Sequence, residues 1–116
     1  MRRLSESAAI RGLSGTLYAV TVRKEGVLIG MGRVIGDGGC FYQIVDIAVR
    51  PDHQGAGLGA RIVEALTRYL ETEAPADAYV SLIADRPADR LYARWGFTET
   101  APASIGMARR AGRRSS

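Results

Sequence analysis

The chain has 116 residues, of which 47% are apolar and 24% charged, and it contains a single cysteine, Cys40. This length suits one globular domain with a core of its own. One cysteine excludes a disulfide framework within the chain, and no apolar run is long enough to span a bilayer. Because no apolar segment typical of a signal peptide follows the N-terminus, we expect a cytoplasmic protein with no membrane partner.

The formal net charge of +4 is concentrated at the two ends of the chain. Six of the 16 basic residues are tail arginines: Arg2, Arg3, Arg109, Arg110, Arg113 and Arg114. The remaining ten basic residues and all 12 acidic residues lie within residues 4–108, so this part of the chain carries a charge of about −2. A nucleic-acid-binding domain concentrates positive charge on its folded surface. The charge distribution therefore argues against a specific nucleic-acid partner.

In the first half of the chain, the patterns predict a short helix and then three strands. The helix covers residues 5–13, and β-branched and aromatic residues place strands over 16–23, 27–35 and 40–49. Turn residues separate the strands. The third strand is apolar on both faces apart from Gln43 and Asp46, which indicates a central strand of a covered sheet.

In the second half, helices alternate with short strands. Apolar residues recur at three- and four-residue spacing from Leu58 to about Glu73, a strand is expected over 78–83, and Pro87 and Gly96 bound a second helix. Residues 105–108 are expected to form a last short strand. The predicted fold class is α/β with a mixed sheet, in one domain over residues 1–108. Residues 109–116 are expected to be a disordered basic tail.

Glycines 55, 57 and 59 lie between the predicted central strand and the helix that begins at Leu58. Glycines let the backbone approach a ligand closely, and a helix N-terminus favours anions, so a phosphate or pyrophosphate is a natural ligand. A simple strand-to-helix connection is the plain alternative. The spacing Gly55-x-Gly57-x-x-Ala60 also matches a dinucleotide-binding fingerprint, but residues 50–54 separate it from the strand.

Two motifs together resemble the GNAT superfamily of N-acetyltransferases. Gln54-x-x-Gly57-x-Gly59 resembles the acyl-CoA signature of that family, and residues 46–51 resemble the strand that precedes it. Residues 88–97, Ala-x-x-Leu-Tyr-x-x-x-Gly-Phe, resemble its motif on the fourth helix. The resemblance covers roughly residues 16–108 and implies a GNAT-like fold that lacks the usual first strand and first helix.

The resemblance implies acetyl-CoA as co-substrate and no metal. The pyrophosphate of acetyl-CoA would lie on the backbone amides of Gln54, Gly55, Ala56, Gly57, Leu58, Gly59 and Ala60. Its pantetheine arm would pair with the backbone of Ile47, Ala48 and Val49, as an added strand does.

The resemblance also assigns roles to individual side chains. Tyr92 matches the tyrosine that protonates the leaving thiolate, and the alternative is that its ring only packs against the sheet. Asp46 is the carboxylate available as general base, or else a structural hydrogen-bond acceptor. Asp85 stands where many members carry an asparagine that contacts pantetheine. His53 is expected to be an ordinary loop residue. Arg33 is expected to be a solvated strand residue, and the alternative is that it recognises a carboxylate or phosphate on the acceptor.

The predicted function is therefore transfer of an acetyl group from acetyl-CoA to a primary amine, on a small molecule or a peptide. The alternative is a catalytically idle acyl-CoA-binding or regulatory module on the same fold. With the first strand missing, the strand over residues 16–23 should lie at a sheet edge. Edges of this kind are usually covered or paired, so a homodimer is expected, either through this edge or through the surface that the missing helix would cover. The alternative is a monomer whose edge is shielded by the N-terminal helix or by Arg23 and Lys24.

Overall fold

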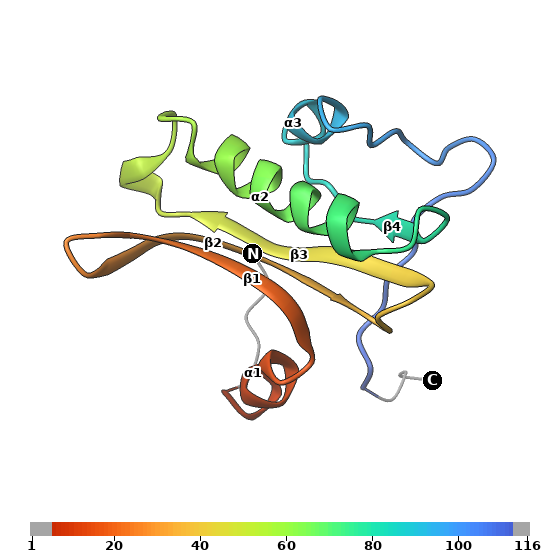
Figure 1. Ribbon diagram of the computed structural model, residues 1–116, viewed down its shortest axis with the longest axis horizontal. Helices are drawn as coiled ribbons and strands as arrows, with labels where there is room; N and C mark the ends of the chain where they lie inside the picture. Colours follow the sequence, from red (N-terminus) through yellow and green to blue (C-terminus); the bar gives the residue numbers. More distant parts are fainter. Residues whose placement is uncertain (1–5, 113–116) are drawn as a thin grey trace.

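The computed structural model describes residues 6–112. Its elements follow in the order α1 (Glu6–Leu13), β1 (Thr16–Lys24), β2 (Val27–Gly36), β3 (Phe41–Val49), the 3-10 turn η1 (Pro51–His53), α2 (Leu58–Glu73), β4 (Tyr79–Ser81) and α3 (Asp89–Ala93). The sheet order is β1-β2-β3-β4, with two antiparallel pairs and a parallel β3–β4 pair. α2 and α3 lie on one face of the sheet and α1 on the other (Figure 1). The predicted mixed α/β fold class is confirmed.

Two tight turns set the register of the antiparallel strands. Glu25 and Gly26 both have positive φ, at 52° and 80°, and they join Lys24 to its cross-strand partner Val27. Two left-handed residues give the turn twist that suits a hairpin. In the β2–β3 turn, Asp37 Oδ1 accepts three backbone N–H bonds at 2.8–3.0 Å. These bonds hold the pKa of the Asp37 carboxyl below its ordinary value.

The core forms where α2 lies across the first three strands. Its fully buried or nearly buried members come from three elements: Val34 on β2, Tyr42 and Ile44 on β3, and Ile62, Leu66 and Leu70 on α2. The α2 residues recur every four positions and so lie on one face of the helix. At Gly30 and Gly32 on β2, an added Cβ would stand 3.1 and 2.7 Å from the Ile62 side chain. The helix therefore lies directly on the backbone of β2.

The second half of the chain has less regular structure than the sequence predicts. β4 has three residues instead of six, and the helix between Pro87 and Gly96 is regular only over Asp89–Ala93. The predicted strand over residues 105–108 is wrong. This segment is irregular, and Ile105 and Met107 are 70% and 87% exposed. It pairs with no strand in the described sheet, so neither burial nor ladder hydrogen bonds favour the extended form.

Strand β1 forms one edge of the sheet and pairs only with β2 within the described residues. The sequence predicts this edge position. Within residues 6–112, no helix is long and apolar enough to cross a bilayer.

Candidate functional site

Strands β3 and β4 pair over only three residues and then separate. Phe41, Tyr42 and Gln43 pair with Tyr79, Val80 and Ser81. Beyond this point the rest of β3, residues 44–49, keeps its pairing with β2 but has no described strand on its other side. On this side of β3, a row of backbone N–H and C=O groups therefore has no partner strand among the described residues, although β3 lies inside the sheet. One of these groups is engaged, since Gln54 Nε2 donates to the carbonyl of Val49 at 3.0 Å.

The open part of β3 leads into the glycine-rich turn and the N-terminus of α2. Gly55 and Gly57 both have φ of 85°, and a Cβ added at either position would meet no atom within 4 Å. The first intrahelical bond runs from Arg61 N to Gly57 O at 3.2 Å. Within residues 6–112, the amide N–H groups of residues 55–60 meet no acceptor. These free donors, at the positive end of a 16-residue helix, favour an anion.

Asp46 lies at a bulge in the open part of β3. Its φ is 57°, and the register with β2 shifts between Met31 and Arg33. The Arg33 guanidinium donates to Asp46 Oδ2 at 2.7 Å and to the Thr16 hydroxyl at 2.8 Å. The Arg33 side chain is 13% exposed, and the Asp46 side chain is 41% exposed. The expectation of a solvated Arg33 is therefore wrong, because this arginine neutralises the one carboxylate on β3.

Tyr92 lies on α3, with its ring edge-on to Phe97 at a centroid distance of 6.3 Å. Burial raises the pKa of the Tyr92 phenol above its ordinary value, and the nearby negative charge of Asp85 raises it further. The phenol therefore keeps its proton at neutral pH. Asp85 itself is exposed, and its carbonyl accepts the N–H of Ala88 at 2.8 Å in the turn before α3.

The remaining candidates form no further catalytic cluster in the described structure. His53 Nδ1 lies 3.1 Å from Asp52 Oδ1 in η1, and this hydrogen bond lowers the pKa of the Asp52 carboxyl. Cys40 is an exposed free thiol between the β2–β3 turn and β3. Among residues 6–112, no group of three or more His, Cys, Asp or Glu side chains could hold a metal ion.

The structure thus brings most of the predicted site residues to one region. Ile47, Ala48 and Val49 lie on the open part of β3, and Gln54 to Ala60 form the turn that follows it. Sequence reasoning missed the pairing of Arg33 with Asp46. A signal for it existed, because Arg33 is the only charged residue on β2 and Asp46 the only one on β3. Adjacent strands that each carry one charge of opposite sign favour a cross-strand pair.

Comparison with known proteins identifies the family. The sequence model of the Acetyltransferase (GNAT) family matches residues 3–97. The chain is similar to the crystal structure of SA2161, a protein of unknown function and probable acetyltransferase from meticillin-resistant Staphylococcus aureus. The identity is 47%, the TM-score is 0.90, and the match covers 95% of this chain and 83% of that one.

Two more distant similarities agree. Over 85 residues the chain is 37% identical to GCN5-related N-acetyltransferase 2, chloroplastic, from Arabidopsis thaliana, which covers 73% of this chain and 32% of the relative. The chain thus spans about a third of the length of that curated relative. A predicted acetyltransferase with acetyl-CoA from Clostridium acetobutylicum shares the fold at 12% identity and a TM-score of 0.66, over 88% of this chain and 70% of that one. The family resemblance is confirmed: the chain belongs to the GNAT family of acetyltransferases.

Proposed function

We propose that this protein transfers an acetyl group from acetyl-CoA to a primary amine, on a small molecule or a peptide. One observation carries the proposal. An open row of β3 backbone groups continues directly into a turn of free amides at the N-terminus of α2. The first feature suits an extended amide-bearing chain, and the second suits a pyrophosphate. Acetyl-CoA carries both groups in one molecule, so the residues present fit it.

The residues divide the binding between them. Ile47, Ala48 and Val49 supply backbone donors and acceptors on β3, and the amides of residues 55–60 supply donors for phosphate oxygens. The predicted contribution of the Gln54 amide is not available, because this amide donates to Pro51 O at 3.4 Å. Asp85, whose negative charge raises the pKa of the Tyr92 phenol, is the residue that we propose to contact the pantetheine arm. Because Gly55 and Gly57 have no side chains, their backbone atoms are accessible to a ligand.

The proposed chemistry is a direct transfer. When bound, acetyl-CoA supplies an activated thioester, so that a carbon–nitrogen bond to the neutral amine forms as the carbon–sulfur bond breaks. Tyr92 donates its phenolic proton to the departing sulfur, which requires the neutral phenol that its raised pKa maintains.

Asp46 is the proposed acceptor of the proton that the amine loses. Arg33 occupies Oδ2 and fixes the orientation of the carboxylate, while Oδ1 makes no hydrogen bond within the described residues. We therefore propose that Asp46 accepts the proton through its free oxygen, directly or through one water molecule.

The test is a thiol-release assay with acetyl-CoA over a panel of small amines and peptides with free N-termini or lysines. The expected result is release of coenzyme A above background with at least one amine, together with a product heavier than the amine by one acetyl group. Saturable acetyl-CoA binding without thiol release for any amine would instead support the idle acyl-CoA-binding module. Absence of binding would overturn both functions.

A further inference from the structure

The ion pair at the β3 bulge lies on the face of the sheet opposite to α2. Gly32 and Val34 on β2 point toward α2, so Arg33 between them points to the other face, where α1 lies (Figure 1). There its guanidinium also reaches the end of α1, since Nη1 donates to the Gly12 carbonyl at 3.4 Å and to the Thr16 hydroxyl at 2.8 Å. Arg33 therefore joins α1, the start of β1 and the β3 bulge.

Each member of this ion pair has one polar atom that is not used. Within residues 6–112, neither Arg33 Nη2 nor Asp46 Oδ1 makes a hydrogen bond. Asp46 is exposed. Nη2 is accessible too, because among the side chains of residues 6–112 that are not exposed, only Thr67 Oγ1 is both buried and unpartnered. The pair therefore presents one free donor and one free acceptor to a ligand.

The two unused atoms lie side by side. In a guanidinium group, the Nε–H bond and one Nη2–H bond point along the same edge of the plane. Arg33 Nε uses this edge to donate to Asp46 Oδ2 at 2.7 Å, so Nη2 and Oδ1 stand next to that hydrogen bond, one on each partner. A ligand that carries a cationic donor and an anionic acceptor close together would pair with both atoms.

The position of the pair identifies the ligand as the acceptor of the proposed acetyl transfer, on which this inference rests. Asp46 is the proposed proton acceptor, and Ile47, which follows it, begins the backbone proposed to hold pantetheine. We infer that the acceptor is a free α-amino acid, whose ammonium group donates to Asp46 Oδ1 and whose carboxylate accepts from Arg33 Nη2. One carbon separates the two charged groups of an α-amino acid, which suits two adjacent atoms of one ion pair.

The transfer balances as an exchange of one bond for another. The carbon–nitrogen bond of an N-acetylamino acid forms as the carbon–sulfur bond of acetyl-CoA breaks. The ammonium group loses two protons in all. One ends on the sulfur of coenzyme A through Tyr92, and Asp46 passes the other to solvent. Simple amines and peptide N-termini have no carboxylate at this distance from the amine and would leave Nη2 unused, so they should be poorer acceptors.

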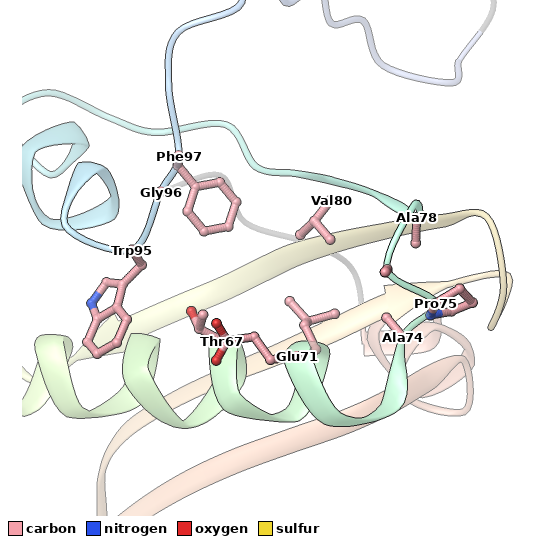
Figure 2. Close-up of a pocket in the computed structure, with 11 residues that line it drawn as sticks. Thr67, Glu71, Ala74, Pro75, Ala78, Val80, Trp95, Gly96 and Phe97 are labelled. Atoms are coloured by element: carbon pink, nitrogen blue, oxygen red, sulfur yellow. The ribbon is translucent and has the colours of Figure 1, made fainter.

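The largest cavity near the core is a different place. It measures about 450 Å³ and lies on the α2 face of the sheet, between α2, β4 and the segment after α3. Its lining is mostly apolar, with Trp95 and Phe97 on one side (Figure 2). Glu71 also lines it, so a Glu71 variant shows whether a ligand binds there instead.

Binding and transfer are measured separately on the full chain. Calorimetry in the presence of coenzyme A, which carries no acetyl group, measures acceptor binding, and thiol release from acetyl-CoA measures transfer. The probes are the common amino acids with a primary α-amine, each compared with its own α-carboxamide. We expect at least one amino acid to bind and to be acetylated with kcat/KM about tenfold or more above its carboxamide, as a charge-assisted hydrogen bond gives.

Two substitutions test whether Nη2 receives the carboxylate. Arg33→Lys keeps the positive charge but removes the fork, so the preference for the amino acid over its carboxamide should disappear while acetyl-CoA binding remains. A purely structural role of Arg33 would lower kcat/KM for both acceptors equally. Gly12→Leu should also reduce the preference without changing any charge, because a Cβ at Gly12 would stand 3.9 Å from Nη2 and a longer side chain would cover this atom.

Two further variants are the controls. Gly106→Leu makes the same change at a glycine where an added Cβ meets no atom within 4 Å, and it should leave the preference intact. Glu71→Gln changes the cavity on the α2 face and should leave amino acid binding unchanged. An effect of Glu71→Gln as large as that of Gly12→Leu would move the ligand to that cavity and overturn the inference.

The remaining outcomes separate this inference from the proposed function. Equal kcat/KM for amino acids and carboxamides, or an undiminished preference in Gly12→Leu and in folded Arg33→Lys, would overturn the inference. Acetylation of other amines with no amino acid bound would overturn it and support the proposed function. Amino acid binding that Gly12→Leu weakens, without thiol release, would support the site and count against acetyl transfer. Neither binding nor transfer would overturn both.

Discussion

Tyr92 has the two properties that a proton donor needs, a protonated phenol and a fixed ring. Its pKa is raised mainly by burial, and its ring packs edge-on against Phe97. Tyr92→Phe keeps the packing and removes the proton, so we expect kcat to fall about 100-fold, within the range of general acid catalysis, while KM for acetyl-CoA changes little. Steady-state kinetics with the best amine of the panel measures both. Tyr79→Phe is the matched control, since Tyr79 is 54% exposed on β4, and unchanged turnover in Tyr92→Phe would make Tyr92 structural.

The same pKa shift predicts a pH profile. A raised pKa means that the phenol stays protonated to higher pH than an ordinary tyrosine, whose value is about 10. Activity should therefore not decline through Tyr92 until the pH exceeds about 10. A decline of activity above about pH 8 that persists in the Tyr92→Phe variant would arise from the titration of another group.

Gly57 tests the anion site at the start of α2. Gly57→Glu places a negative charge beside the free amides, so acetyl-CoA binding should fall below detection by calorimetry. The backbone strain of a side chain at positive φ needs its own control. Gly26→Glu serves this purpose, because Gly26 has a φ of 80°, faces open space as Gly57 does, and lies in the β1–β2 turn. Equal binding by both folded variants would contradict the phosphate assignment.

At the residue scale, the sequence located the glycine-rich turn and Tyr92 because both belong to contiguous motifs. The Arg33–Asp46 pair depends on the register between β2 and β3 and on the bulge at Asp46. Neither the strand register nor the bulge can be predicted from the local sequence. Thr67 escaped notice for a related reason: on the helical pattern it is one polar residue among several, and only the packing of the second half of the chain buries it.

Among the elements, α2 packs directly on the backbone of β2 in the core. An added methyl group at Gly32 would approach Ile62 at 2.7 Å, Leu66 at 3.0 Å and Ile47 at 3.2 Å. Ile62 and Leu66 are fully buried and have no room to move. Gly32→Ala should therefore lower the free energy of unfolding by about 1–3 kcal/mol, as overpacking does.

The matched control for this prediction is Gly30→Ala, whose nearest contact is a single Ile62 methyl at 3.1 Å. Chemical denaturation of both variants should show the larger loss at Gly32. A Gly32→Ala variant as stable as the wild type would mean that α2 can shift away from the sheet without cost.

Element boundaries were predictable where tertiary contacts agree with local pattern. α2 begins at Leu58 and ends at Glu73 as its apolar spacing and Pro75 predict, and β1 to β3 match within two residues. β4 is shorter than its apolar run because β3 diverges from it after Gln43. That divergence is a property of two strands together, so the pattern of one strand cannot reveal it.

The whole molecule presents β1 as an open edge with apolar residues on it. Leu17 and Tyr18 are 38% and 36% exposed. Within the described residues β2 pairs with one side of β1, and no strand pairs with its outer side. We propose that a second copy of the chain pairs with this edge in a two-fold dimer. Light scattering at micromolar concentration should then give twice the monomer mass.

Proline at Ala19 and at Val20, made separately, tests the edge. Successive N–H groups in a strand alternate in direction, so one of the two positions points its N–H toward β2 and the other toward the open edge. The edge-facing proline should abolish the dimer and preserve the melting temperature, whereas the other should destabilise the fold. A monomeric wild type, or a dimer that tolerates both prolines, would contradict this assembly.

The three-residue pairing between β3 and β4 also divides the molecule by its resistance to local opening. β1, β2 and β3 are joined by long ladders and covered by α2, whereas the segment from β4 through α3 is tied to the sheet by one short ladder. In hydrogen–deuterium exchange, the amide of Val34 should exchange only through global unfolding. The amides of Val80 and Leu91 should exchange through local opening of their segment, which costs less free energy. Acetyl-CoA bound between β3 and this segment would suppress that opening, so the slowing of exchange at Leu91 on adding acetyl-CoA would report cofactor capture without any acceptor amine. Uniform protection across both halves, with or without acetyl-CoA, would mean that the separated strands open and close as one unit with the rest of the fold.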